Sequence, residues 1–118
     1  MQPFSVFSLG NVLLVSIQEE IDDVGVASLY ETIAGKVQTS KAHGVILDLH
    51  DVEVVDSYLA RNLQQLTASL SLMRAMVVVV GLAVPVVMTL IDFGIDLKGM
   101  KFALDVEQAV IMLKQKSL

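Results

Sequence analysis

A chain of 118 residues is long enough for one domain with a single hydrophobic core and too short for two. Its net charge of −5, with no stretch that concentrates Lys and Arg, disfavours nucleic-acid binding. The absence of cysteine excludes disulfides, thiol catalysis and thiolate metal sites. We therefore expect one domain spanning residues 1–118.

The composition is unusually apolar, with 54% hydrophobic residues and a mean hydropathy of +0.68. A small domain has little interior in which to bury so much hydrocarbon, so we expect self-association or assembly with homologous domains. The N-terminal Met-Gln-Pro-Phe-Ser lacks the basic region and apolar run of a signal peptide. We therefore expect a cytoplasmic protein.

The first predicted elements are two β-rich runs at 4–9 and 12–17. Gly10 and Asn11 join them, and this dipeptide suits the positive φ angles of a two-residue hairpin turn. The fold is expected to open with an antiparallel pair of strands.

The following elements alternate between helix and strand. The first helix is capped by Asp22 or Asp23 and runs to about Lys41; a strand at 44–49, a helix from Ser57 to about Met73 and a strand at 75–80 follow. A helix from Pro85 to Phe93, stopped by Gly94, then leads to a strand at 100–103. The last helix starts at Asp105 and Gln108, which resemble a capping box, and has Lys114 and Lys116 near its end. Such alternation predicts parallel strands joined by right-handed crossovers. We expect an α/β fold with a mixed β-sheet, in which the opening antiparallel hairpin precedes parallel strands connected and flanked by about four helices.

Residues 75–91 carry no charge and approach the length of a membrane-spanning helix. However, a run of four valines ends at Gly81, and Pro85 falls where a new helix would begin, which divides the stretch into strand, turn and helix. Its charged flanks also lack the aromatic belt of a membrane span. A buried core segment is therefore expected, with no membrane insertion.

Five residues close in sequence, His43, Asp48, His50, Asp51 and Ser57, allow a hydrolytic triad to be considered. Ser57 lacks the Gly-x-Ser-x-Gly elbow, no glycine-rich oxyanion loop is present, and His50 lies beside acidic residues as surface histidines commonly do. The pattern does not favour catalysis.

Cofactor and metal sites are also disfavoured. Residues 94–99 match neither the Gly-x-Gly-x-x-Gly motif nor a P-loop, so their glycines indicate turns. His43 and His50 bracket a strand without the i, i+4 spacing of a helical metal site. A receiver domain would need acidic partners for Asp48 around Mg²⁺, and the run 4–17 supplies none. We expect no cofactor and no metal.

The most informative stretch is 43–62, in which a mostly apolar strand leads to a helix that starts at Ser57. A serine there can cap the first backbone N–H groups, and the helix dipole also favours a negative charge, so the position suits a phosphate as well. A purely structural cap and a phosphorylation switch are the two interpretations.

The segment Val55-Asp56-Ser57-Tyr58-Leu59-Ala60-Arg61 resembles the phosphorylation site of STAS domains, the anti-sigma-factor antagonist family. The similarity extends along the chain, through the opening hairpin, the strand at 44–49, the valine-rich strand that ends at a glycine, and Pro85 with Thr89-Leu90-Ile91 before Phe93-Gly94. Within the family the segment is most similar to the single-domain antagonists of bacterial stressosomes. Better-known members have a second hydroxyl residue and a glycine where this chain has Tyr58 and Leu59, which argues against an antagonist that binds an anti-sigma factor directly.

The resemblance implies a non-enzymatic protein of a large STAS assembly that, when unphosphorylated, sequesters a serine-protein switch kinase. Phosphorylation of Ser57 would release the kinase towards sigma-factor-dependent stress signalling, and a cognate phosphatase would reverse it. The residues implied in partner binding are Asp56, Ser57, Tyr58 and Arg61, together with Asp22 and Asp23. A STAS-like module that binds a small ligand or regulates a transporter complex is the alternative.

Overall fold

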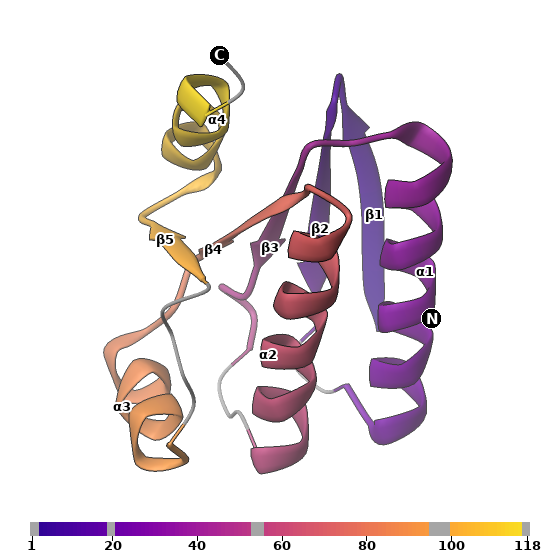
Figure 1. The fold of residues 1–118 in the computed structure, drawn as a ribbon. Helices are drawn as coiled ribbons and strands as arrows, with labels where there is room; N and C mark the ends of the chain where they lie inside the picture. The colour runs from indigo at the N-terminus through magenta and orange to yellow at the C-terminus, as the bar shows by residue number, and fades with distance from the viewer. Residues whose placement is uncertain (1–2, 19–20, 53–55, 95–99, 117–118) are drawn as a thin grey trace.

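The computed structural model describes residues 3–18, 21–52, 56–94 and 100–116 (Figure 1). In chain order its elements are β1 (Phe4–Leu9), β2 (Val12–Ile17), α1 (Asp23–Ser40), β3 (Gly44–Asp48), α2 (Ser57–Leu72), β4 (Met76–Val80), α3 (Val84–Asp92), β5 (Lys101–Ala103) and α4 (Val106–Lys116). The expected order of strands and helices is confirmed, and the boundaries agree to within one or two residues.

The strands form one sheet in the order β1-β2-β3-β4-β5. β1 and β2 pair antiparallel, and β2, β3, β4 and β5 pair in parallel. The predicted mixed α/β sheet is therefore confirmed. Each of β3, β4 and β5 lies next to the strand that precedes it, always in the same direction across the sheet. Because the crossovers that connect parallel strands are right-handed, the helices in these crossovers lie on one face of the sheet.

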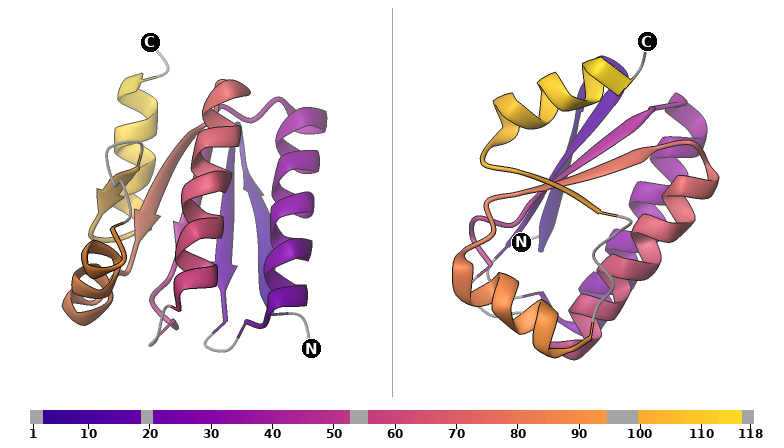
Figure 2. Two further views of the ribbon diagram at one scale, coloured as in Figure 1. Left: turned by 60° about the horizontal axis from the view of Figure 1, so that its bottom comes forward. Right: turned by 60° about the vertical axis from the view of Figure 1, so that its left-hand side comes forward.

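The helices cover both faces of the sheet unequally (Figure 2). α1, α2 and α3 pack on one face in the larger apolar core, whereas α4 packs on the other, against Val12, Ile46, Val78 and Val80. Both faces of β3 and β4 are thus buried, which explains why their sequences are continuously apolar rather than alternating.

The hairpin turn differs in one respect from the expectation. Gly10 has a φ of +62°, but Asn11 is not in the left-handed region. A single positive φ at the first central residue is typical of a type II′ turn, which needs glycine there and not at the next position.

The uncharged stretch 75–91 divides as expected. It contains β4, a turn in which Gly81 has a φ of +80°, and most of α3, which begins with proline in its first turn. Across the described ranges of the chain, no helix is long and apolar enough to cross a membrane. Of the turn predicted at 94–99, residues 95–99 lie outside the described part.

The capping box expected at the last helix is confirmed in modified form. The Asp105 carboxylate accepts a hydrogen bond from the Gln108 backbone N–H at 2.9 Å, and the Gln108 side chain accepts one from the Leu104 N–H at 2.9 Å. The return bond thus reaches one residue further back than in the standard motif.

Candidate functional site

The starts of α1 and α2 lie at the same end of the molecule, where the parallel strands have their carboxyl ends (Figure 1). Loops at this edge of an α/β sheet are the usual place for functional side chains. The residues that sequence analysis associated with partner binding are therefore brought to one end of the fold: Asp22, Asp23, Asp56, Ser57, Tyr58 and Arg61.

Asp56, not Ser57, is the N-cap of α2. The Asp56 carboxylate accepts a hydrogen bond from the Leu59 N–H at 2.8 Å, its backbone is extended, and α2 begins at the next residue, Ser57. Of the two interpretations of Ser57, the purely structural cap is wrong, because the capping residue precedes the first helical residue and that position is held by Asp56.

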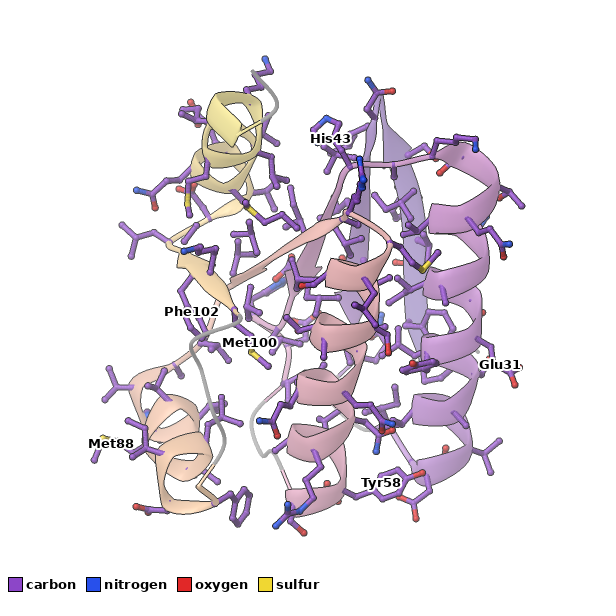
Figure 3. All side chains as sticks on the ribbon, in the orientation of Figure 1. Glu31, His43, Tyr58, Met88, Met100 and Phe102 are labelled. Carbon is purple, nitrogen blue, oxygen red and sulfur yellow. The ribbon has the colours of Figure 1, made fainter. Side chains whose placement is uncertain are left out.

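Ser57 and Tyr58 stand in the first turn of α2 and Arg61 in the next turn, and all three side chains are exposed. Ser57 and Arg61 are four residues apart and so are neighbours on one face of the helix. Tyr58 is 42% exposed and extends from the first turn of α2 on the side of α1 (Figure 3). Asn62 stabilises this turn by donating from its side chain to the Tyr58 carbonyl at 2.8 Å.

The start of α1 repeats this arrangement. Asp22 is the N-cap, and its carboxylate accepts a hydrogen bond from the Gly25 N–H at 2.7 Å. Asp23 is the first helical residue, and both acidic side chains are exposed. The alternatives for the N-cap are thus resolved in favour of Asp22.

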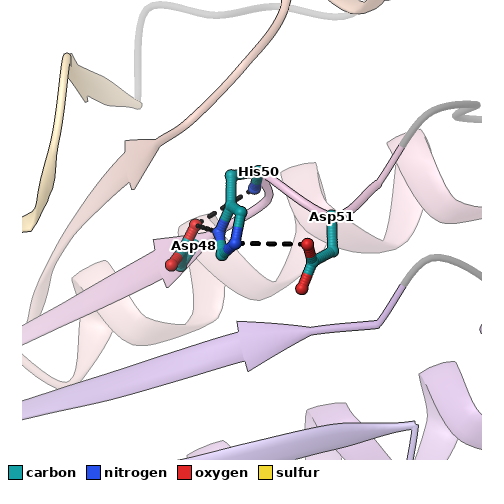
Figure 4. A network of polar contacts seen from close by, with 3 residues as sticks. All are labelled: Asp48, His50 and Asp51. Atoms are coloured by element: carbon teal, nitrogen blue, oxygen red, sulfur yellow. Dashed lines mark hydrogen bonds and ion pairs between the residues drawn. The ribbon is translucent and has the colours of Figure 1, made fainter.

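Three of the residues that sequence analysis considered for a triad, Asp48, His50 and Asp51, form a polar cluster at the end of β3 (Figure 4). His50 Nδ1 lies 2.7 Å from Asp48 Oδ1, and His50 Nε2 lies 3.2 Å from Asp51 Oδ1. The hydrogen bond to Asp48, followed by the charges of Asp48 and Asp51, raises the pKa of His50 above its ordinary value of 6.5. Sequence analysis placed His50 beside acidic residues but did not predict that both of its ring nitrogens contact them. The sequence Asp-Leu-His-Asp, which begins at the last residue of β3, was the available signal.

The same loop is held against the neighbouring strand. The Leu49 N–H donates to the Val80 carbonyl at 2.9 Å, and a Cβ placed on Gly81 would lie 2.8 Å from the His50 backbone nitrogen. The glycine therefore permits the ends of β3 and β4 to approach each other closely. The connection that leads to Ser57 thus starts from a loop that is hydrogen-bonded to the end of β4.

This geometry does not assemble a catalytic triad from the described residues. Both ring nitrogens of His50 face carboxylates, so neither is directed at Ser57. His43 lies at the opposite end of β3, where its N–H donates to the Asn11 carbonyl at 3.0 Å. Within the ranges that the structure covers, no group of three His, Asp or Glu residues could hold a metal ion.

The family model of the STAS domain matches residues 5–109. Since this match covers most of the chain, including the hairpin, the sheet and the start of α2, the chain belongs to the STAS domain family. A search of curated proteins finds no match.

Solved structures give a similar picture. A variant of RsbS from Moorella thermoacetica is 26% identical with a TM-score of 0.87, over 96% of this chain and 96% of that one. A chain from a structure of the stressosome, described as a signal integration and transduction hub, is 26% identical with a TM-score of 0.85, over 96% and 98%. The anti-sigma factor antagonist SpoIIAA in its unphosphorylated form, at 12% identity and a TM-score of 0.73 over 98% and 99%, shares the fold.

Proposed function

We propose that this chain is a non-enzymatic, phosphorylation-regulated antagonist and scaffold of a stressosome-type assembly in the cytoplasm. Its unphosphorylated form sequesters a serine-protein switch kinase, and phosphorylation of Ser57 releases the kinase to activate sigma-factor-dependent stress signalling. A cognate phosphatase restores the bound state. The proposal is supported by family membership and by the likeness to RsbS and to a stressosome chain along nearly the whole length.

The observation that carries the proposal is the division of roles between Asp56 and Ser57. Because the Asp56 carboxylate already caps α2, the Ser57 hydroxyl is not needed for the helix and stands exposed on its first turn. A hydroxyl that capped the helix would have to give up its hydrogen bond before it could accept a phosphate. Here the acceptor and the cap are different side chains.

The first turn can also accommodate the modified residue. The first N–H groups of a helix have no acceptor within the helix, and the helix dipole stabilises an anion at this end. Arg61, one turn further on, is placed to pair with a phosphate on Ser57. We therefore expect the phosphorylated chain to keep its fold.

The surface, in contrast, changes considerably. Phosphorylation adds about −1.5 to −2 charges next to Asp56 and beside the half-exposed ring of Tyr58. A kinase surface that contacts Tyr58 and the acidic residues at 22–23 would meet a strongly altered potential. Loss of the kinase without loss of the fold is the expected result.

A phosphorylation assay tests the acceptor. The chain is incubated with the cognate kinase and ATP, and the phosphate is located by phosphopeptide mapping. Ser57→Ala should abolish incorporation, whereas Ser71→Ala, which removes another exposed serine of α2, should not. Incorporation that is unchanged in Ser57→Ala would refute the assignment.

A second assay tests the switch. Kinase affinity and thermal unfolding are measured for the wild type, Ser57→Ala, Ser57→Asp and the phosphoprotein. We expect Ser57→Ala to keep the kinase bound, the phosphoprotein to lose it, and Ser57→Asp to lose it partly, since Asp carries less charge than phosphoserine. Equal affinities for all four would exclude the switch, and affinity losses that track unfolding would give Ser57 a structural role only.

The cavity described between α1 and α2 does not support the alternative of a small-ligand module. The cavity between α1 and α2, lined by Val26, Leu29, Tyr30, Leu59, Asn62, Leu63 and Leu66, has a volume of about 10 Å³. This is the space of about one water molecule. It cannot hold an organic ligand without separating the two helices.

A further inference from the structure

The two edges of the sheet differ in how well they are protected against further strand pairing. β5 is only three residues long and contains Lys101, and short, charged edge strands resist pairing. β1 is six residues long, contains no charged residue or proline, and pairs with β2 in an unbroken register without a bulge. The β1 edge thus lacks each of these protective devices.

The exposed half of β1 is also apolar. The strand is buried at Phe4 and becomes exposed towards its end, where Phe7 and Leu9 are 57% and 44% exposed. Both residues lie on the sheet face that carries α4, beside the half-buried Leu14, which is the register partner of Phe7. An edge with free hydrogen-bonding groups therefore adjoins an uncovered hydrocarbon surface.

The hydrogen-bond pattern identifies the groups that point outwards. The Pro3 carbonyl accepts a hydrogen bond from the Gln18 N–H at 2.8 Å, so the backbone polar group of Pro3 points towards β2. In an antiparallel ladder, residue pairs that exchange both backbone hydrogen bonds alternate with pairs that exchange none. The backbone N–H and C=O groups of Ser5, Phe7 and Leu9 therefore also point towards β2. Val6 and Ser8 therefore present their N–H and C=O groups at the open edge.

We propose that β1 pairs antiparallel with β1 of a second copy of this chain, about a two-fold axis at Phe7. In this register Val6 of one copy exchanges both backbone hydrogen bonds with Ser8 of the other, and the two Phe7 side chains meet as a non-hydrogen-bonded pair. Aromatic pairs are favourable at such positions. The sheets of the two copies become one continuous sheet.

Charge favours a second copy as the occupant of this edge. Two copies with a net charge of −5 each repel one another over most orientations. No side chain before Glu19 is charged, so the hairpin is a place where two copies can meet without opposing carboxylates. An antiparallel pairing about a two-fold axis is also self-complementary, as a closed dimer requires.

The inference rests on the scaffold part of the proposed function and not on its switch. The β1-β2 turn lies at the opposite end of the molecule from the start of α2 (Figure 1). Phe7→Lys should therefore weaken self-association and leave kinase binding unchanged, whereas phosphorylation of Ser57 should do the reverse. The failure of one proposal is distinguishable from that of the other.

Cysteine cross-linking tests the interface directly, because the wild-type chain has no cysteine and any disulfide must join two copies. Opposed Cα atoms of a non-hydrogen-bonded pair are about 4.5 Å apart, within the range that a disulfide spans. Under mild oxidation we expect Phe7→Cys to form a covalent dimer at least ten times faster than Leu72→Cys. Leu72 is the matched control, since it is 89% exposed and lies at the end of α2.

Sedimentation equilibrium provides the second measurement, with thermal unfolding to verify that each variant is folded. Phe7→Lys should weaken self-association at least tenfold, whereas Leu72→Lys should not alter it. Equal cross-linking rates for Cys at positions 7 and 72, a monomeric wild type, or equal effects of the two lysine variants would overturn the proposal. Pairing of β1 only with a different STAS protein would overturn it as well.

Discussion

The side chain of Leu113 in α4 occupies the space that a Cβ on Gly44 in β3 would fill, since that Cβ would lie 2.8 Å from Leu113 Cδ1 and Cδ2. Gly44 is buried, and its lack of a side chain lets the last helix approach the sheet. This contact, together with Ile46 and Val78, attaches α4 to the face opposite the other helices.

Gly44→Ala should therefore lower the free energy of unfolding by about 1–3 kcal/mol through overpacking. Leu113→Ala should lower it by about 2–5 kcal/mol, and the double variant by less than the sum, because the new methyl group fills part of the space left by Leu113. Urea denaturation of the four proteins measures this coupling. Gly35→Ala is the control: its Cβ meets nothing within 4 Å in α1, so it should stabilise the chain by about 0.5–1 kcal/mol.

Gly81→Ala should be more damaging than Gly94→Ala. Both glycines have positive φ angles, +80° and +71°, so each substitution costs roughly 1–2 kcal/mol of backbone strain. Only the Cβ at position 81 would also contact the His50 backbone, at 2.8 Å. Thermal unfolding of the two variants isolates this contact, and equal losses of stability would show that the close approach has no energetic consequence.

The two residues at the start of α2 should respond differently to truncation. Asp56→Ala removes the hydrogen bond to the Leu59 N–H and should cost about 0.5–2 kcal/mol. Ser57→Ala removes an exposed hydroxyl in the first turn and should change stability by less than about 0.5 kcal/mol. Chemical denaturation measures both losses of stability. A larger loss for Ser57→Ala than for Asp56→Ala would show that the serine caps the helix.

The loop after β3 should respond to pH through His50. Hydrogen bonding to Asp48 and the nearby charges of Asp48 and Asp51 raise the pKa of His50. The contribution of these contacts to stability is therefore fully present below pH 6.5, the ordinary pKa, and is lost as pH rises through the raised pKa of the folded state. NMR titration of the histidine ring protons should give a midpoint above 6.5 for His50.

His50→Gln and His43→Gln provide the matched pair for this measurement. Only the first should remove the pH dependence of amide protection, the exchange rate relative to that of an unfolded chain at the same pH, in residues 48–52. Because His50 is largely exposed, we expect a local effect rather than a large change in global stability. A midpoint of His50 at or below its ordinary value would contradict the role of the two carboxylates.

Most of the architecture was predictable because it depends on local patterns. Alternation in the first runs, a glycine at the hairpin turn, and apolar residues at helical spacing in α2 each specify one element through nearby residues. The order of elements then restricts the sheet topology, since parallel strands require crossovers. These predictions needed no information on contacts between distant parts of the chain.

The site was less predictable for the opposite reason. Asp56 and Ser57 are both good capping residues in sequence, and only the backbone conformation decides which one precedes the helix. Likewise, the contact of His50 with Gly81 joins two loops thirty-one positions apart. The sequence also could not predict which face of the sheet α4 covers, because none of the described strands follows α4 and so no crossover fixes its side.

The strands lie in the sheet in the same order as in the chain. During synthesis, each strand can therefore add to the edge left by its predecessor as soon as it leaves the ribosome, and no segment has to be inserted between strands already paired. New strands are added next to β2, then β3, then β4, whereas no later strand in the described part of the chain is added next to β1. The outer edge of β1 is therefore accessible from the moment the hairpin forms. The edge that we propose to pair with a second copy is therefore formed before the rest of the sheet is complete.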